Sequence, residues 1–220
     1  MDDDTELLLF SGGPDSTILL KDFLQKGKKI RVLYIEMGWA LRTQLRIKLQ
    51  DKVVEDVLHY IKNKYGSFEF SRAGIYTSMA NGNEENYFGM DDQWCAFFGA
   101  MFCKTYNIKK MWTGNFTCTE QVVKERDNKT QEWLYNGSMQ PYLDAGAMFS
   151  KSYEYCTPKS VYNGTDIDRF KTKKEAWDSL EIELKDMVRS CTSDKFFCGK
   201  CSKCWTSLNY KLRDESGNPL

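Results

Sequence analysis

The residues best suited to do chemistry form two short clusters, one near each end of the chain. Near the start, residues 11–16 read Ser-Gly-Gly-Pro-Asp-Ser directly after an apolar run. Glycine lets an anion approach the backbone closely, and a helix start presents N–H groups and positive partial charge to it. The carboxylate of Asp15 and the hydroxyls of Ser11 and Ser16 suit a magnesium ion that bridges phosphate oxygens. The first cluster therefore predicts a phosphate site.

A glycine turn that is merely capped by Asp15 or Ser16, without a ligand, is the alternative interpretation. The chain contains neither the Gly-x-x-x-x-Gly-Lys-Ser/Thr pattern of Walker A loops nor the Gly-x-Gly-x-x-Gly pattern of dinucleotide sites. The whole string at a strand-to-helix turn is much less common than a pair of glycines alone, so we favour anion binding.

The second cluster consists of four cysteines with the spacing C-x6-C-x2-C-x2-C, namely Cys191, Cys198, Cys201 and Cys204. Four thiolates match tetrahedral zinc, and Gly199 supplies a tight turn between two of them. An iron–sulfur cluster is the alternative, because closely spaced thiolates bind iron as well. We favour zinc as the bound metal. Since four protein ligands leave zinc no open position for water, we expect a structural role.

The elements that must position these clusters alternate along the chain. Hydrophobic periodicity predicts strands at residues 7–10, 30–35, 67–71 and 110–113, and helices at residues 14–26, 43–61 and 94–102. This alternation indicates an α/β fold with a doubly wound parallel sheet, whose ligand crevice lies at the carboxyl ends of the strands. Residues 74–90 read as a loop, and residues 117–168 show no convincing periodicity.

The C-terminal part of the chain is predicted to be a helical module. Residues 172–175 read Thr-Lys-Lys-Glu, a capping box, and an apolar pattern continues this helix to residue 188, just before the cysteines. We therefore expect two domains, an α/β domain with the predicted phosphate site over residues 1–170 and a helical segment with the four-cysteine zinc site over residues 171–220.

Composition limits the classes of function. The 220 residues include 31 Lys plus Arg and 31 Asp plus Glu, so no global field draws the chain to nucleic acid. No apolar run approaches the roughly 18 residues of a spanning helix, and three aspartates stand where a secretory signal needs positive charge. The other four of the eight cysteines are scattered, as is typical of a reducing compartment. We expect a cytoplasmic protein with a small-molecule substrate and no membrane or direct nucleic-acid partner.

Three further features have conservative interpretations. His59, the single histidine, lies within a predicted helix and is expected at the surface rather than in catalysis. Cys95 and Cys103 are expected in the core, and Cys118, although near the predicted site, is interpreted as a small buried apolar residue. An exposed aromatic patch within residues 133–155 would favour self-association as a homodimer.

The string at residues 11–16 resembles the signature of the PP-loop, or N-type, ATP pyrophosphatases, which cleave ATP between the α and β phosphates and pass AMP to a substrate oxygen. Together with the four cysteines, it makes the chain similar to the 7-cyano-7-deazaguanine synthases of queuosine biosynthesis. Residues 36–38, Glu-Met-Gly, stand where that family places Asp-Tyr-Gly, and residues 172–175 and 190–191 resemble its Thr-Lys-x-Glu and Ser-Cys motifs. Residues 90–92 read Met-Asp-Asp in place of its Arg-Asn pair, which favours a diverged member.

This resemblance implies an adenine nucleotide alpha hydrolase-like fold and a carbon–nitrogen ligase that uses ATP and Mg²⁺. Its substrates would be a deazapurine carboxylate, 7-carboxy-7-deazaguanine, and ammonia, and its product the 7-cyano compound. Asp15 and Ser16 would be catalytic, Zn²⁺ would bind the four cysteines, and the nucleotide contacts would be Phe10, Ser11, Gly12, Gly13, Asp15, Ser16 and Thr17. Position at the carboxyl ends of strands nominates as substrate residues Glu36, Gly114, Asn115, Thr117 and Glu120.

Two alternatives from other classes share the same loop. One is a PP-loop enzyme of the tRNA thiolation type, with an iron–sulfur cluster at the cysteines. The other is a relative that binds ATP without catalysis. The neutral net charge argues mildly against RNA as the substrate.

Overall fold

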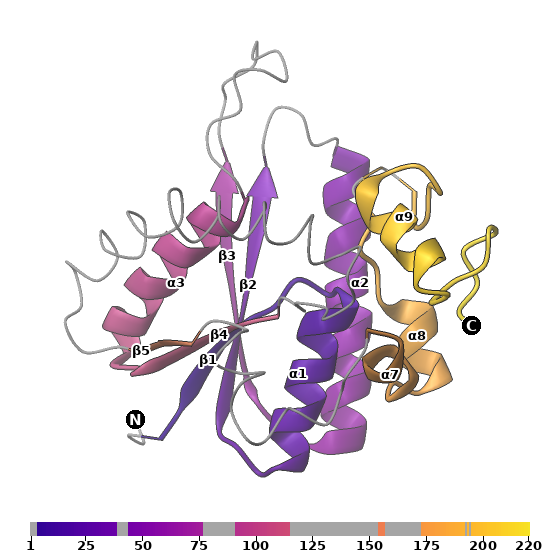
Figure 1. Cartoon of the computed structure of the whole chain (residues 1–220). Coiled ribbons are helices and arrows are strands. Elements are labelled where there is room, and N and C mark those ends of the chain that lie inside the picture. The colour runs from indigo at the N-terminus through magenta and orange to yellow at the C-terminus, as the bar shows by residue number, and fades with distance from the viewer. Residues whose placement is uncertain are drawn as a thin grey trace.

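The computed structural model describes residues 4–38, 44–76, 91–114, 154–156, 173–191, 193 and 195–220. In this part of the chain, parallel strands form one sheet in the order β3-β2-β1-β4-β5 (Figure 1). The strands are β1 Glu6–Leu9, β2 Ile30–Gly38, β3 Glu69–Tyr76, β4 Lys110–Thr113 and β5 Glu154–Cys156. The helices between them are α1 Pro14–Gln25, α2 Gln44–Tyr65 and α3 Asp91–Tyr106.

Helices cover both faces of this sheet, with α1 and α2 on one face and α3 on the other (Figure 1). Side chains alternate along each strand, so Leu8 and Val32 pack toward α1 and α2, whereas Leu7 and Leu33 pack toward α3. Strands buried on both faces explain the continuous apolar runs in the sequence. The predicted doubly wound α/β fold is confirmed.

The order of the strands creates a switch point between β1 and β4. From β1 the chain proceeds through α1, β2 and α2 to the edge strand β3, and α3 then returns it to β4 on the other side of β1. In open α/β sheets, ligands bind beside the carboxyl ends of strands at such a point. Residues 11–16, the predicted phosphate site and hereafter the phosphate loop, follow β1 directly and so lie at this position.

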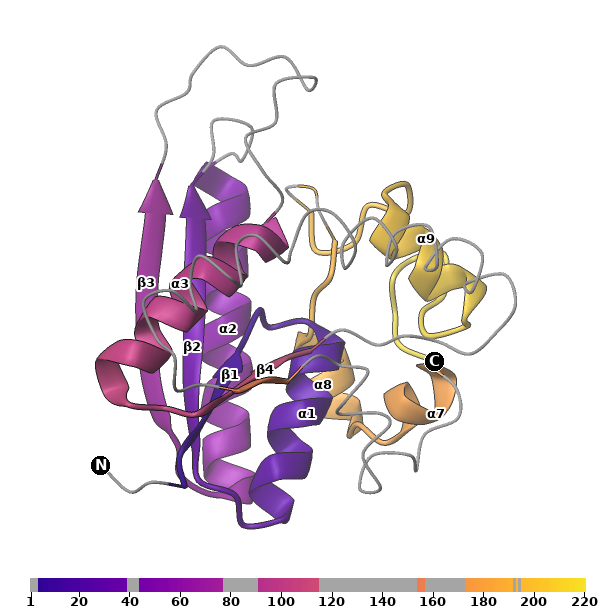
Figure 2. The same cartoon turned by 60° about the vertical axis from the view of Figure 1, so that its left-hand side comes forward.

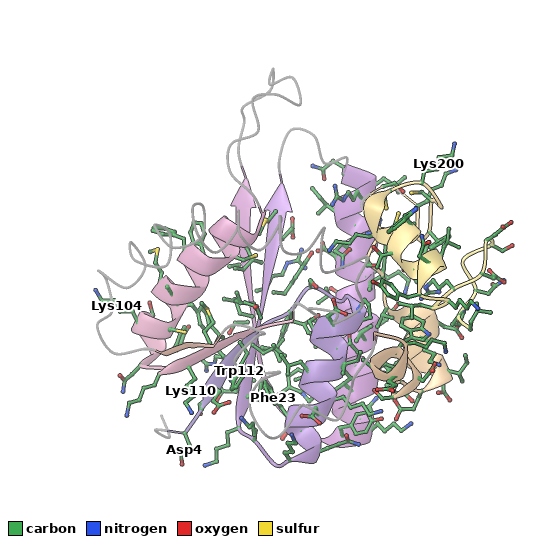
Figure 3. The ribbon with its side chains drawn as sticks, viewed as in Figure 1. Asp4, Phe23, Lys104, Lys110, Trp112 and Lys200 are labelled. Carbon is green, nitrogen blue, oxygen red and sulfur yellow. The ribbon has the colours of Figure 1, made fainter. Side chains whose placement is uncertain are left out.

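Strand β4 is held to α1 by an aromatic contact. The rings of Phe23 and Trp112 meet edge to face with centroids 5.0 Å apart (Figure 3). The indole N–H of Trp112 also donates a 2.7 Å hydrogen bond to Glu6. Since Gly114 follows Trp112 by two residues, alternation directs it to the α1 side as well.

The C-terminal module lies outside α1 and α2 as a further layer (Figures 1 and 2). It consists of α7 Lys173–Asp178, α8 Ile182–Met187 and α9 Ser202–Asn209. Helix α7 contacts α1, and α8 contacts α2. Trp177, Leu184 and Val188 join the same buried cluster as Leu8 of β1. The predicted domain boundary near residue 170 lies outside the described residues and stays a prediction.

The prediction of one helix from residue 172 to residue 188 was wrong. Helix α7 ends at Asp178, and α8 begins at Ile182 after an extended Glu181. The break has a tertiary cause, because Lys21 of α1 donates both to the carbonyl of Ser179 and to the carboxylate of Glu181. The capping-box residue Thr172 lies outside the described residues.

In the sheet, one strand is longer than predicted and another was not predicted. Strand β3 continues to Tyr76, whereas residues 74–90 were predicted as a loop, and β3 lies at one edge of the described sheet. Strand β5 was not predicted; its three residues pair in parallel with β4. A strand this short carries too little alternation to be recognised from sequence.

The predicted positions of these residues are confirmed where the structure describes them. His59 is exposed on α2, where its ring contacts the side-chain amide of Asn63 at 2.9 Å. Cys103 is fully buried under α3 and Cys95 is partly buried against the same cluster. Cys118 and the aromatic segment 133–155 lie outside the described residues. Among the helices that are described, none combines the length and apolar character needed to cross a membrane.

We expect Lys21→Met to loosen the junction between α1 and α8. The buried ammonium of Lys21 lies 3.0 Å from Glu181, and methionine keeps the apolar stem but leaves the acceptors without that partner. The free energy of unfolding should fall by roughly 1–3 kcal/mol in urea denaturation. Lys52→Met, which breaks an exposed pair with Asp56, is the control and should cost less than about 0.5 kcal/mol.

The Lys21→Met penalty should also shrink in acid. Burial raises the pKa of Glu181, but hydrogen bonds from Tyr65 and Lys21 outweigh it, so the folded pKa is below its ordinary value. Stability from this carboxylate is therefore present above the unfolded pKa of about 4.3 and is lost as the pH falls through the folded pKa. A penalty independent of pH, or equal to that of Lys52→Met, would contradict this account.

Candidate phosphate loop and metal centre

The loop between β1 and α1 crosses the carboxyl edge of the sheet. Phe10 belongs to the hydrophobic core, and its N–H donates to the carbonyl of Leu33 at 2.9 Å. After it, Ser11 is exposed, while Gly12 and Gly13 are buried as the chain turns into α1. Phe10 thus anchors the loop through its side chain, and the residues after it face the edge where ligands bind.

Hydroxyl groups close the loop on itself. The hydroxyls of Ser16 and Thr17 donate to the carbonyl of Gly13 at 3.2 and 2.8 Å. The N–H of Gly13 donates to Ser11 Oγ at 3.4 Å, and the Ser11 and Ser16 hydroxyls lie 3.3 Å apart. The predicted serines therefore converge at one place, although they are five positions apart in sequence.

The start of α1 meets the loop at the same place. Pro14 occupies the first turn, Asp15 is the acidic residue of that turn, and no side-chain hydrogen bond caps the helix at Gly13 in the described structure. The positive end of the helix macrodipole thus lies beside the serine hydroxyls. Together these groups offer what an anion with a bound cation needs: N–H donors, hydroxyls and one carboxylate.

Glycine is required on two sides of this loop. Gly12 has a φ of +72°, and a Cβ there would lie 3.1 Å from methyl groups of both Val53 and Val54 on α2. A Cβ on Gly114, at the end of β4, would lie 2.5 Å from the backbone N and Cα of Ser16. The loop is therefore packed between α2 and β4, with no room for a side chain at Gly114 and only a tight fit for one at Gly12.

The predicted substrate residues are only partly described. Gly114 packs directly against the phosphate loop. Glu36 lies on β2, is buried, and accepts a hydrogen bond from Arg72 of β3, which also pairs with Asp51 of α2 at 2.7 Å. Asn115, Thr117 and Glu120 lie outside the described residues, so their predicted roles stay predictions.

The ion pairs around Glu36 form a small polar network at the α2 side of the sheet. The hydrogen bond to Glu36 raises the pKa of Arg72 above its ordinary value. Burial, with a 2.9 Å hydrogen bond to Asp51, raises the pKa of Tyr34. Glu36 and Asp51 thus share one guanidinium, and the side chain of Arg72 is 41% exposed to solvent.

The four cysteines come together as predicted. The sulfur atoms of Cys191, Cys198, Cys201 and Cys204 all lie within 4.8 Å of one another. The distances from Cys198 to Cys204 and from Cys191 to Cys201 are both 3.9 Å. Zinc–sulfur bonds of about 2.3 Å in a tetrahedron place the sulfurs about 3.8 Å apart. The donor set fits a zinc ion, and its sulfur chemistry also suits iron.

Backbone N–H groups donate to the sulfur atoms of this cluster. Cys201 is the N-cap of α9 and accepts from the N–H of Cys204, while Cys198 accepts from the N–H of Cys201 at 3.4 Å. Gly199 has a φ of +70°, which makes the turn between them. A backbone hydrogen bond from Lys200 lowers the pKa of Cys198, whereas burial raises that of Cys204 to about 12. A bound metal would deprotonate both.

Sequence reasoning missed Arg189 and Gln50, which connect the two sites. The backbone N–H of Arg189 donates to the carbonyl of Gly12 at 3.2 Å, and its guanidinium donates to Gln50 at 2.8 Å. Gln50 in turn donates its amide to the carbonyl of Ser11. Burial lowers the pKa of Arg189 from its ordinary value. The only sequence signal was an arginine at the end of an apolar pattern, and nothing in the sequence paired it with Gln50.

Two grooves lie elsewhere, between α2 and the C-terminal module. They enclose about 480 and 420 Å³, and Asp56 and Met187 line both. Neither is lined by a residue of the phosphate loop.

No protein-family model matches this chain, and no curated protein matches it significantly. The class is therefore defined by the geometry itself: an α/β protein with a glycine-rich loop at the switch point of its sheet and a four-cysteine cluster that can hold a metal ion.

We expect Gly12→Ala to be more destabilising than Gly27→Ala. Both glycines have φ near +70°, so both substitutions carry the left-handed backbone cost of about 1 kcal/mol. A Cβ at Gly27 meets nothing within 4 Å, whereas a Cβ at Gly12 presses on Val53 and Val54. This contact should lower the free energy of unfolding by about 1–2 kcal/mol more. Urea denaturation measures the difference, and equal losses would show that the loop is not tightly packed on α2.

The cysteine cluster is expected to bind one zinc ion per chain. Each of Cys191→Ser, Cys198→Ser, Cys201→Ser and Cys204→Ser should weaken metal binding by more than about 100-fold, because loss of a ligand exceeds loss of a supporting contact. Elemental analysis after purification measures the metal, with Cys95→Ser as the control. Zinc leaves the protein colourless, so visible absorbance from iron would contradict the assignment.

Proposed function

We propose that this chain is an ATP pyrophosphatase of the PP-loop class. The observation that carries the proposal is the loop itself: two serine hydroxyls 3.3 Å apart, an acidic first turn and an uncapped helix start, all at the switch point of the sheet. These groups suit the triphosphate of ATP with Mg²⁺. Asp15 would hold the magnesium ion, and Ser11, Ser16 and the loop N–H groups would bind phosphate oxygens.

The charge around the loop favours a polyanion as well. The buried guanidinium of Arg189 is two hydrogen bonds away from Ser11, through Gln50. A cation that is excluded from water attracts phosphate more strongly than one at the surface. The loop has no lysine of the Walker A type, so this arginine is the buried cation linked to it in the described structure.

Within this class, we further propose that the substrate is a deazapurine carboxylate, 7-carboxy-7-deazaguanine, which the enzyme converts with ammonia to the nitrile. The combination of the loop with a C-terminal four-cysteine centre supports this assignment. Glu36 would accept hydrogen bonds from ring and amino N–H groups of the base, and the exposed side of Arg72 would face its anionic group.

A carboxylate is a poor electrophile, so it must be activated before ammonia can attack it. A carboxylate oxygen attacks the α phosphorus of ATP, and pyrophosphate leaves. Ammonia then attacks the acyl carbon, AMP leaves with that oxygen, and a proton is lost to give the amide. A second ATP activates the amide oxygen in the same way, with loss of one N–H proton, and departure of AMP with loss of the remaining N–H proton gives the nitrile.

Groups of this chain would assist these reaction steps through where they lie. Loop N–H groups and the positive end of α1 would stabilise charge that develops on the α phosphate. Bound magnesium would withdraw electron density from the phosphate oxygens and so improve pyrophosphate as a leaving group. The cysteine centre, with four protein ligands, has no position for substrate and would serve the structure.

The direct test is product analysis by mass spectrometry. Protein incubated with ATP, Mg²⁺, ammonium and 7-carboxy-7-deazaguanine should release pyrophosphate and form the nitrile. Asp15→Asn should lower kcat/KM by about 100-fold or more, because it removes the charge that holds magnesium. Asp56→Asn, a carboxylate on the exposed side of α2, is the matched control and should retain activity.

The outcomes separate the candidate functions. An amide without nitrile would restrict the proposal to the first activation. Absence of pyrophosphate with every carboxylate tried, despite ATP binding, would favour a relative that binds ATP without catalysis. Turnover unchanged in Asp15→Asn would overturn the assignment of the loop.

A further inference from the structure

Arg189 lies between the phosphate loop and the cysteine centre and contacts both. Its side chain is 3% exposed, and its guanidinium makes four hydrogen bonds. One goes to Gln50 on α2, and three go to the carbonyls of Ser193 and Lys195, which lie between the first and second cysteines. A buried guanidinium is stable only while its N–H groups are paired, so its position depends on both sets of partners.

Two contacts lead from Arg189 to the phosphate loop, and both act on carbonyl groups. The N–H of Arg189 donates to the carbonyl of Gly12, and the amide of Gln50 donates to the carbonyl of Ser11. A peptide unit is planar, so a fixed carbonyl also fixes the N–H on the opposite side of the same plane. The two contacts therefore orient the N–H groups of Gly12 and Gly13, which are candidate phosphate donors.

The carbonyls that hold the guanidinium depend on the cysteine centre. Ser193 Oγ lies 3.1 Å from the sulfur of Cys191, and the N–H of Ser193 lies 3.5 Å from it. Ser193 is partly buried and Lys195 is exposed, so their own side chains contribute little to holding this backbone. Phe196 packs against the core cluster and holds the segment after Lys195, so the part nearest Cys191 depends most on the cysteines. A metal bound at Cys191 and Cys198 would fix this segment from both ends.

We infer that Arg189 is a positioning residue that makes the order of the phosphate loop depend on metal at the four cysteines. Bound metal orders the carbonyls of Ser193 and Lys195, these hold the guanidinium, and Arg189 with Gln50 orients the peptide planes of the loop. That an ordered loop serves nucleotide binding rests on the proposed function. The transmission itself requires no nucleotide.

Hydrogen exchange followed by mass spectrometry tests the transmission in the full-length protein without ATP. Removing zinc with a chelator, monitored by elemental analysis, should speed exchange in peptides that cover residues 11–17 by roughly tenfold, the effect of losing about one net hydrogen bond. Exchange in α8 should change by less than about twofold, because Leu184 and the contact between Lys21 and Glu181 hold this helix independently.

Substitutions then locate the path. With zinc bound, Arg189→Met should already exchange about tenfold faster in the loop, and chelation should add less than about twofold. Gln50→Met removes one of the two contacts from the surface of α2 and should give an intermediate metal response. Its matched control is Gln44→Met, the same change at the exposed first turn of that helix, which should respond as the wild type does.

Arg213→Met controls for loss of a buried arginine from the same module. Arg213 is 6% exposed and donates to the carbonyls of Lys185, Val188 and Gly217. A purely structural role for Arg189 predicts that both arginine variants exchange faster throughout α7–α9 and keep the metal response of the loop. The inference predicts that only Arg189→Met loses that response.

Several results would overturn the inference. These are loss of zinc without a change in loop exchange, equal rises in the loop and in α8, or a normal metal response in Arg189→Met. If Arg189→Met fails to fold, a wild-type response in Gln50→Met overturns it, and an intermediate response supports it. Failure of ATP to bind the zinc-loaded protein would remove the proposed function but would leave these exchange results, and the inference they test, unaffected.

Discussion

The close approach of the phosphate loop to its neighbours is the constraint on which the rest of this structure depends. Gly12 lies against Val53 and Val54 of α2, and Gly114 brings the end of β4 against the backbone of Ser16. A Cβ at Gly12 would press on the two valines and one at Gly114 would overlap the backbone of Ser16, so the shape of the loop depends on where α2 and β4 lie. Their places follow from the sheet, whose central strand β1 is buried on both faces.

The C-terminal module reinforces this arrangement from the outer side of α1 and α2. Apolar residues of α7 and α8 complete the core over one face of the sheet, and Lys21 ties the break between these helices to α1. Arg189 extends the same module to the loop, where it contributes hydrogen bonds and a buried positive charge. A metal bound by the four cysteines would supply no catalytic position but would still matter to the site, because by our inference it would hold the segment that holds this arginine.

Most of the fold could be predicted because its signals are local. Buried parallel strands give uninterrupted apolar runs, and amphipathic helices give a period of 3.6 residues, so β1, β2, α1, α2 and β4 were placed nearly correctly. The failures have tertiary causes. The helix predicted through Ser179 is interrupted because Lys21 takes the carbonyl of that residue, and β5 exists only because β4 offers it an edge.

The sequence by itself determined the two chemical clusters, since each is a short string whose spacing alone brings its members together: Ser-Gly-Gly-Pro-Asp-Ser at a strand end, and four cysteines around Gly199. Only the tertiary structure decided their surroundings. Arg189 and Gln50 are 139 residues apart, and Glu36 and Arg72 lie on different strands. Such pairs have no common period and no motif, because their contact arises from how helices and strands pack and not from the chain between them.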